Sequence, residues 1–241
     1  MSTKLYSNLA KYYDLIYSHK DYQTDAKYQQ QLIAKYQKSK GKELLEVACG
    51  TGNYLQFYER KFNATGIDLN PGMIAEAKKR LKKTDLKVGD MRTFKLNKQY
   101  DVITCLFSSI AYMRNAKDLQ KTIQNFSNHL KPGGVIIISP WLAKSKYKVG
   151  KISMNTYADD KISLVRMSTH KLIQPNISVI EWTWLVGKPN KEVEIISNDR
   201  HELVMHSKAD YLDAMKKAGL KGLFINRTPE GRGLYVVTKP L

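Results

Sequence analysis

The residues best placed to do chemistry in this sequence follow a short apolar segment, ELLEV, at 43–47. Gly50 and Gly52 come directly after it, ahead of a short run with helical character. A strand, a glycine turn and the start of a helix place backbone N–H groups around a small anionic or polar ligand. Glycine suits such a turn because the loop takes unusual dihedral angles and lets a ligand approach the backbone. A cofactor loop fits this pattern, although plain αβ connections and other nucleotide sites share it.

Acidic and aromatic residues stand after the later predicted strands. Asp68 ends the second strand, where a carboxylate can accept both hydroxyls of a ribose. Asp90 follows the third strand, beside Met91, whose flexible apolar side chain can cover a flat ring. Phe107 and Tyr112 follow the fourth strand. Either acid alone would fit a helix cap or a turn. Because ligands of doubly wound sheets bind beyond the carboxyl ends of the strands, their shared position predicts one site.

The elements that must position these residues alternate in type along the chain. The predicted strands are 43–49, 64–69, 86–88, 100–107 and 135–139, separated by helices near 54–60, 71–83 and 116–130. Two last strands, 220–226 and 233–238, look like a hairpin. This alternation predicts an α/β fold with a doubly wound, mostly parallel sheet of seven strands covered by helices on both faces.

The pattern changes after Trp141. Residues 154–203 contain β-branched, alternating runs separated by turn residues, which predict an antiparallel β insert after strand five. Residues before 41 are rich in tyrosine and predict amphipathic helices. We therefore expect an N-terminal helical lid (1–40), a cofactor-binding domain (41–142 and 205–241) and an insert on the substrate side (143–204).

Composition limits the classes of partner. The formal net charge of +18 favours polyanions, but the lysines are spread along the chain and also fit a solvated surface or a phosphate-bearing small substrate. Cys49 and Cys105 are expected to be buried reduced thiols, and the histidines lack metal-binding spacing, so no metal is predicted. No apolar run approaches the length of a membrane helix and no signal-peptide core is present, which predicts a cytoplasmic protein.

The segments ELLEVACGTG, GIDLNPGMI, VGDM, YDVITCLFSSIAY and LKPGGVIII together resemble the class I S-adenosylmethionine (SAM)-dependent methyltransferases, which are Rossmann-like. A dinucleotide-binding protein would share the first turn and Asp68, but would not call for the GDM segment or the final hairpin. The resemblance implies SAM as cofactor, with Ala48, Gly50 and Gly52 near the methionyl part, Asp68 near the ribose and Asp90 with Met91 near the adenine. We also expect Tyr13 and Phe107 in this cofactor site.

The resemblance extends over nearly the whole chain to the N,N-dimethyltransferases of nucleotide-linked amino sugars in deoxysugar pathways of the desosamine and mycaminose type. It is carried by YDLIY, KDY, GDMRTF, LFSSIAY and PEGRGLY. It implies that Tyr6 and Tyr112 lie near the sugar amine as catalytic residues and that Arg232 contacts the nucleotide. We expect Trp141 and Arg166 to line the substrate site too. The segment Ser139–Leu142 and the residue Glu230 depart from the family pattern, which leaves the particular sugar and nucleotide open.

The activity implied is methyl transfer to the neutral amine of a dTDP-type amino deoxysugar. Tyrosine, with an ordinary pKa near ~10, is a poor base at neutral pH, so we expect Tyr6 and Tyr112 to orient the amine while water takes the proton. A methyltransferase acting on another small molecule or on RNA is the alternative, and a protein that binds SAM or a nucleic acid without catalysis is a third. No appended RNA-binding domain is evident, so nucleic acid is not the expected partner. The insert could serve as a homodimer surface or as a wall of the substrate site.

Overall fold

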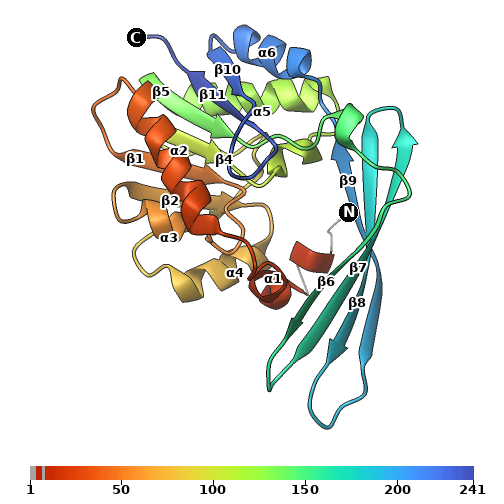
Figure 1. Cartoon of the computed structure of the whole chain (residues 1–241). Helices are drawn as coiled ribbons and strands as arrows, with labels where there is room; N and C mark the ends of the chain where they lie inside the picture. The colour runs from red at the N-terminus through yellow and green to blue at the C-terminus, as the bar shows by residue number, and fades with distance from the viewer. Residues whose placement is uncertain (1–3, 7–8) are drawn as a thin grey trace.

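The computed structural model describes residues 4–6 and 9–241 of the chain. Its larger sheet has the strand order β10-β11-β5-β4-β1-β2-β3 (Figure 1). The strands are β1 (Glu43–Val47), β2 (Asn63–Asp68), β3 (Asp85–Val88), β4 (Tyr100–Cys105), β5 (Leu130–Ile138), β10 (Lys221–Ile225) and β11 (Leu234–Thr238). β1 to β5 pair in parallel, whereas β11 is antiparallel to both of its neighbours. The predicted doubly wound, mostly parallel sheet of seven strands is confirmed.

Helices cover both faces of this sheet because its central strands are apolar on both sides. Adjacent residues of β1 show this: Leu45 packs with α5 (Ala116–His129) and α6 (Lys208–Lys217), and Leu44 packs on the opposite face. That second face is covered by α2 (Tyr22–Tyr36), α3 (Leu55–Tyr58) and α4 (Pro71–Arg80). The predicted helix 54–60 is shorter in the structure, where only one turn is α-helical.

Local sequence sets where several helices begin. The Asp21 side chain accepts from the Thr24 backbone N–H at the start of α2, and Pro71 occupies the first turn of α4. Ser207 and Asp210 form a capping box at the start of α6. The remaining helices are short: α1 (Ala10–Ile16) and the 3-10 helices η1 (Lys4–Tyr6), η2 (Ser109–Tyr112) and η3 (Lys144–Lys146).

A second sheet follows β5 and is wholly antiparallel, in the order β6-β7-β8-β9 (Figure 1). Its strands are β6 (Ile152–Ala158), β7 (Ser163–Gln174), β8 (Ile177–Gly187) and β9 (Glu194–Val204). The predicted antiparallel insert after strand five is therefore present. Its inner face buries Leu164, Trp184 and Leu203 against the N-terminal segment, where Leu5 and Ile16 are buried. This packing places β9 close to η1 and η2.

An extra residue in β9 sets which of its side chains face inward. Trp182 of β8 pairs with Asp199, whereas Trp184 pairs with Ile196, so β9 is bulged between these pairs. Asn198 adopts a left-handed backbone with φ +62° at this point. The bulge shifts the alternation by one residue, so that Asp199 and His201 are both buried on the inner face. Within the described residues, no helix combines the length and apolar character needed to cross a membrane.

Candidate active site

The turn after β1 is built around left-handed backbone. Ala48, Gly50 and Gly52 have φ values of +57°, +55° and +80°. A methyl group added at Gly50 would meet nothing within 4 Å, so the backbone there faces open space. At Gly52 it would lie 2.6 Å from Leu81, so the turn packs directly on the segment after α4. The predicted glycine turn therefore presents one open backbone position, at Gly50, next to the end of β1.

Asp68, at the end of β2, braces this turn. Its Oδ2 accepts from the Gly50 backbone N–H at 2.9 Å, and its Oδ1 accepts from the Asn70 backbone N–H at 2.9 Å. The side chain is mostly buried, and this burial raises the pKa of Asp68 despite those two donors. Each oxygen keeps a further lone pair for a ligand hydroxyl.

Glu46 is a site residue that sequence reasoning missed. It lies within β1, is 1% exposed, and its Oε2 has no hydrogen-bonding partner among the described residues. Burial, followed by the nearby charge of Asp68, raises the pKa of this carboxyl well above its ordinary value. An acid at an inward position of an otherwise apolar strand was the available sequence signal, because such a group costs free energy unless something pairs with it.

A small cavity opens at this point, between the glycine turn and the N-terminal helices. It is lined by residues from the turn, from α1 and from the end of β4, including Tyr13, Glu46, Ala48, Gly50, Phe107 and Ser109. The structure thus brings together four of the predicted cofactor residues: Tyr13, Ala48, Gly50 and Phe107. A ligand with an ammonium group and a ribose fits here: a cation beside the unpaired Oε2 of Glu46 would favour the ionised form of that carboxyl, and Asp68, which is bonded to the turn, has lone pairs left for a ribose hydroxyl.

Asp90 and Met91 follow β3 and do not line that cavity. Both carboxylate oxygens of Asp90 are bonded to Arg92, whose Nη2 donates to Oδ2 at 2.6 Å. This guanidinium lowers the pKa of Asp90, so the carboxylate stays ionised. Met91 packs against the core on the α5 side.

Tyr6 and Tyr112 come from η1 and η2 and meet directly. Their hydroxyl oxygens are 2.9 Å apart. Burial raises the pKa of both hydroxyls above the ordinary value, so neither is ionised at neutral pH. The two predicted catalytic tyrosines, far apart in sequence, form one hydrogen-bonded pair.

A histidine continues this pair. His201 Nδ1 lies 2.6 Å from the Tyr112 hydroxyl, and its Nε2 lies 3.2 Å from Oδ1 of Asp199. Oδ2 of Asp199 accepts from the indole N–H of Trp184 at 3.0 Å. Sequence reasoning did not single out His201 or Asp199, because strict alternation along β9 does not anticipate the bulge that turns both inward.

Arg166, on the inner face of β7, is a buried cation with spare donors. It is 5% exposed, and its Nη2 donates to the Asn155 side chain at 2.7 Å. Its Nε and Nη1 have no hydrogen-bonding partner among the described residues. The guanidinium stacks over Trp182 and Tyr17, at 4.3 Å and 4.7 Å from their ring centres. A buried guanidinium with two free N–H edges is suited to an anionic or hydroxyl-bearing ligand.

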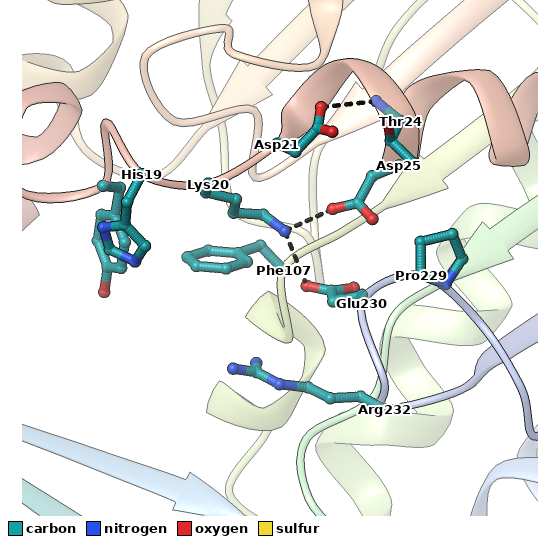
Figure 2. A pocket seen from close by; sticks show the side chains of 10 residues that line it. His19, Lys20, Asp21, Thr24, Asp25, Phe107, Pro229, Glu230 and Arg232 are labelled. Carbon is teal, nitrogen blue, oxygen red and sulfur yellow. Dashed lines mark hydrogen bonds and ion pairs between the residues drawn. The ribbon is translucent and has the colours of Figure 1, made fainter.

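A larger cavity of about 470 Å³ lies between the start of α2 and the turn that precedes β11. Lys20 lies between Asp25 and Glu230 in this cavity (Figure 2). Its Nζ is 2.5 Å from a carboxylate oxygen of Asp25 and 3.7 Å from one of Glu230. Lys20 is therefore already paired. Arg232 extends from the turn on another side of the cavity, and its Nη1 donates to the Ser108 hydroxyl at 2.8 Å.

Trp141 lies beside this cavity. The guanidinium of Arg232 stacks 4.9 Å from its ring centre, and its indole N–H donates to Ser178 of β8 at 2.9 Å. Phe107 lines both the larger and the smaller cavity, so the two are neighbours. Among the residues that the structure describes, no group of His, Cys, Asp and Glu side chains is arranged to hold a metal ion.

Comparison with known proteins agrees with this geometry. Residues 44–134 match a family model described as a methyltransferase domain. The chain is 33% identical, over 94% of its length and 96% of the relative's, to the dTDP-3-amino-3,4,6-trideoxy-alpha-D-glucopyranose N,N-dimethyltransferase of Streptomyces venezuelae.

Solved structures give the same result. The fold is similar to that of DesVI from Streptomyces venezuelae, with a TM-score of 0.89 at 31% identity, covering 96% of this chain and 98% of that one. It is also similar to a SAM-bound amino pentose methyltransferase from Micromonospora echinaspora, with a TM-score of 0.81 at 29% identity and coverage of 91% and 92%.

Proposed function

The chain belongs to the family of N,N-dimethyltransferases of dTDP-linked amino sugars, and from that premise we propose how its own residues carry out the reaction. It is a SAM-dependent N-methyltransferase that methylates the amino group of a nucleotide-linked amino sugar. The observation that carries the assignment of roles is the contact between the Tyr6 and Tyr112 hydroxyls, with the Tyr6 ring 6.4 Å from that of Tyr13, which lines the cavity at the glycine turn.

We assign the cofactor to the smaller cavity and the adjoining strand ends. SAM supplies a methyl group on a sulfonium, whose sulfur leaves with the bonding electrons. Glu46 would pair with its ammonium group, Asp68 would accept the ribose hydroxyls, and Asp90 with Met91 would lie at the adenine. Gly50 presents backbone to the ligand because nothing fills the space beside it. Tyr13 and Phe107 exclude water from the methionyl part.

The two tyrosines orient the attacking nitrogen. A neutral amine must point its lone pair at the methyl carbon, and its N–H bonds need acceptors. The hydroxyl oxygens of Tyr6 and Tyr112 lie side by side and can supply these acceptors. Both hydroxyls remain un-ionised, so they orient the amine and do not act as strong bases. Alignment of this kind can lower a barrier by about 7–11 kcal/mol.

The substrate's diphosphate would lie in the larger cavity. Arg232 is anchored by Ser108 and stacked on Trp141, so its planar fork is held ready for phosphate oxygens. Arg166 packs over Tyr17, which lines this cavity, and has two nitrogens that are unpartnered among the described residues. Lys20 is not assigned to phosphate, because two carboxylates already neutralise it.

A direct assay tests this function. The purified protein is incubated with methyl-labelled SAM and either a panel of dTDP-amino sugars or total RNA. Label in a dTDP-amino sugar is expected, and label in RNA alone would contradict the substrate class.

Tyr6→Phe and Tyr112→Phe should each lower turnover by roughly 10²-fold, with the double variant no more than marginally worse, since the residues act as a unit. Tyr157→Phe, at a half-buried tyrosine of β6 whose hydroxyl donates to Asp159, is the matched control. Near-normal rates in both site variants would remove the tyrosines from the reaction.

We further propose that three segments of the chain have different roles. Residues 1–40 form a lid, of which 1–3 and 7–8 lie outside the described residues; 41–142 with 205–241 bind the cofactor, and 143–204 form the substrate wall. A cytoplasmic location is proposed, consistent with two cysteines that are separate buried thiols.

A homodimer is proposed through the outer face of the second sheet. Exposed apolar side chains occupy neighbouring positions of all four strands there: Ile152, Met154, Met167, Leu185 and Ile195. Contiguous exposed apolar surface of this kind is typical of protein–protein contacts, and a second copy would cover the same face. Light scattering after gel filtration should give a dimer mass for the native chain and a monomer mass for Met167→Glu. A native monomer at micromolar concentration would contradict it.

A further inference from the structure

We propose that His201, held by Asp199, fixes the hydrogen-bond direction of both tyrosine hydroxyls and receives the proton released by the substrate amine. This proposal rests on the methyl transfer proposed above and adds two residues to it, with His201 in place of the water expected from the sequence as the proton acceptor. His201 is a positioning residue in this scheme, since it reaches the substrate only through Tyr112.

The partners of His201 decide its tautomer. The imidazole is 1% exposed, and its Nε2 lies 3.2 Å from Oδ1 of Asp199. Among the described residues neither of these two atoms makes a hydrogen bond of good geometry, and the Trp184 indole N–H occupies Oδ2, so the facing carboxylate oxygen is the acceptor open to Nε2. A carboxylate only accepts, so the proton of the neutral ring resides on Nε2 and Nδ1 carries the lone pair.

That tautomer sets the direction of the next two hydrogen bonds. With a lone pair on Nδ1, Tyr112 must donate its O–H to His201 across 2.6 Å. Tyr112 has then used its only hydrogen, so the contact of 2.9 Å with Tyr6 is donated by Tyr6. Both tyrosine oxygens are left with lone pairs facing outward, and neither can donate to an incoming group. The pair therefore binds N–H bonds and leaves the nitrogen lone pair free to attack.

The same chain of bonds provides a balanced route for the proton. When the N–C bond forms and the C–S bond breaks, the nitrogen becomes a cationic ammonium. It passes one proton to the oxygen of Tyr112, as Tyr112 passes its own hydrogen to Nδ1 of His201. The amine ends neutral, the tyrosine is unchanged, and the imidazole becomes a cation opposite Asp199. Tyrosinate is never formed, which agrees with the raised pKa of the buried hydroxyl.

The groups packed around His201 suit a neutral acceptor. Asp199 faces it from β9, Arg166 lies near it from β7, and Tyr112 and Tyr6 face it from η2 and η1. Trp182 of β8 packs against the ring in a tilted arrangement, with the ring centres 3.9 Å apart. Burial, with the charge of Arg166, lowers the pKa of His201 more than Asp199 raises it. The ring is therefore neutral at pH 7, before the reaction, with the lone pair of Nδ1 available to Tyr112.

Two variants separate this role from simple packing. In His201→Asn the side-chain oxygen can replace Nδ1 as an acceptor for Tyr112 but cannot take a proton. We expect kcat for the amino sugar to fall by about 10²–10⁴-fold, with KM and SAM binding by calorimetry nearly unchanged. In Asp199→Asn an amide can donate to Nε2, which moves the ring proton to Nδ1 and reverses the direction of the tyrosine bonds. This variant should lose kcat to a similar degree.

A measurement independent of turnover is the ¹⁵N spectrum of histidine-labelled protein. The chain has five histidines, and the His201 signals are those lost in His201→Asn. We expect an unprotonated Nδ1 and a protonated Nε2 in the native protein at pH 7, and the opposite in Asp199→Asn. A native Nδ1 that carries the proton would overturn the proposal, whatever the turnover of the variants.

Failure of this proposal differs from failure of the proposed function. If native protein methylates a dTDP-amino sugar and His201→Asn does so at the native kcat, the relay is wrong and the function stands. If native protein methylates no amino sugar while the ¹⁵N spectrum shows the expected tautomer, the substrate assignment is wrong and the relay serves another acceptor.

Discussion

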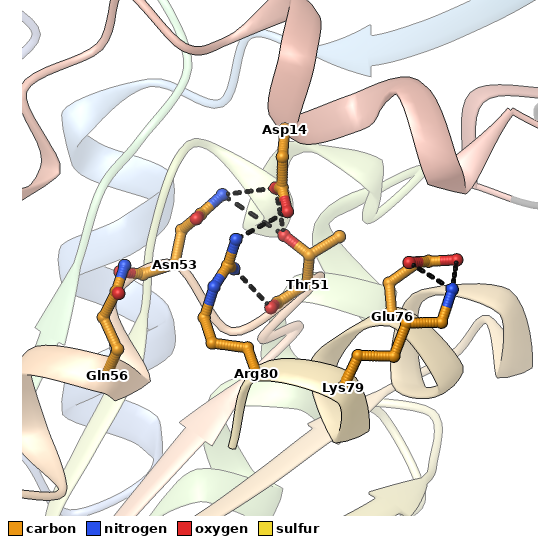
Figure 3. A network of polar contacts seen from close by, with 7 residues as sticks. All are labelled: Asp14, Thr51, Asn53, Gln56, Glu76, Lys79 and Arg80. Carbon is orange, nitrogen blue, oxygen red and sulfur yellow. Dashed lines mark hydrogen bonds and ion pairs between the residues drawn. The ribbon is translucent and has the colours of Figure 1, made fainter.

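Asp14 of α1 accepts a hydrogen bond from the hydroxyl of Thr51, in the glycine turn, at 2.6 Å. The same carboxylate accepts from Arg80 at the end of α4, and Arg80 also donates to the Thr51 carbonyl at 2.7 Å (Figure 3). One carboxylate thus ties the N-terminal helix to the cofactor turn and to the helix behind it. If α1 acts as the proposed lid, this contact should slow exchange of a ligand beneath it.

Arg80→Met is expected to speed dissociation of SAM. The ion pair is partly exposed, so its loss should raise the off-rate by roughly two- to fivefold without unfolding the protein. Stopped-flow displacement of SAM measures this rate. Lys79→Met, which removes an exposed pair with Glu76 on the same helix (Figure 3), is the matched control. Equal off-rates in the two variants would mean that the contact between Arg80 and Asp14 does not slow dissociation of SAM.

Asp68→Asn should weaken SAM binding. The amide keeps the size of the side chain but replaces one acceptor oxygen with a donor that opposes the Gly50 or Asn70 N–H. Loss of charge-assisted bonds to the turn and to ribose should cost about 1.5–3 kcal/mol, or roughly 10- to 150-fold in Kd. Isothermal titration calorimetry measures this. Asp85→Asn, at the exposed start of β3, is the control, and an unchanged Kd in Asp68→Asn would remove the carboxylate from the site.

The stability of the fold should depend on Asp101 at acid pH. Its carboxyl is buried at the start of β4; burial raises its pKa, but Lys131 and the backbone N–H of Glu43 outweigh burial and lower it. A folded pKa below the unfolded one stabilises the protein above the unfolded value, near ~3.9, and this contribution disappears as pH falls through the folded pKa.

Asp101→Asn should therefore lower the free energy of unfolding by about 1–3 kcal/mol at pH 7 and by less near pH 3. Urea titrations at both pH values, followed by circular dichroism, provide the comparison. A deficit of the same size at both pH values would show that the charge of Asp101 is not the cause.

The bulge at Asn198 should be required for turnover. Its φ of +62° is readily taken by glycine and costs a β-branched residue about 1–2 kcal/mol. Asn198→Gly should keep kcat within a few-fold of native, whereas Asn198→Val should relax the bulge, turn His201 from the inner face and lower kcat toward the level of His201→Asn. Equal rates in the two variants would contradict a role for the bulge in aiming this strand.

The features that could be predicted from the sequence are those set by residues close together along the chain. The order of strands and helices followed from apolar periodicity, and the glycine turn from residues adjacent in the chain. Helix ends were predicted less well: the helix at 54–60 reduces to α3, because no capping residue holds its start and packing alone selects its length.

The fold class and the family could be predicted from the sequence, since both depend on short segments whose residues are neighbours along the chain. Tertiary structure alone decided that Lys20 is neutralised by two carboxylates, that Asp14 binds the cofactor turn, and that His201 continues the tyrosine pair. These contacts join distant segments, and the last one depends on a single extra residue in β9. Alternation predicts which face a side chain takes only while the register is unbroken, so the bulge that completes the site was visible only once β8 and β9 were paired.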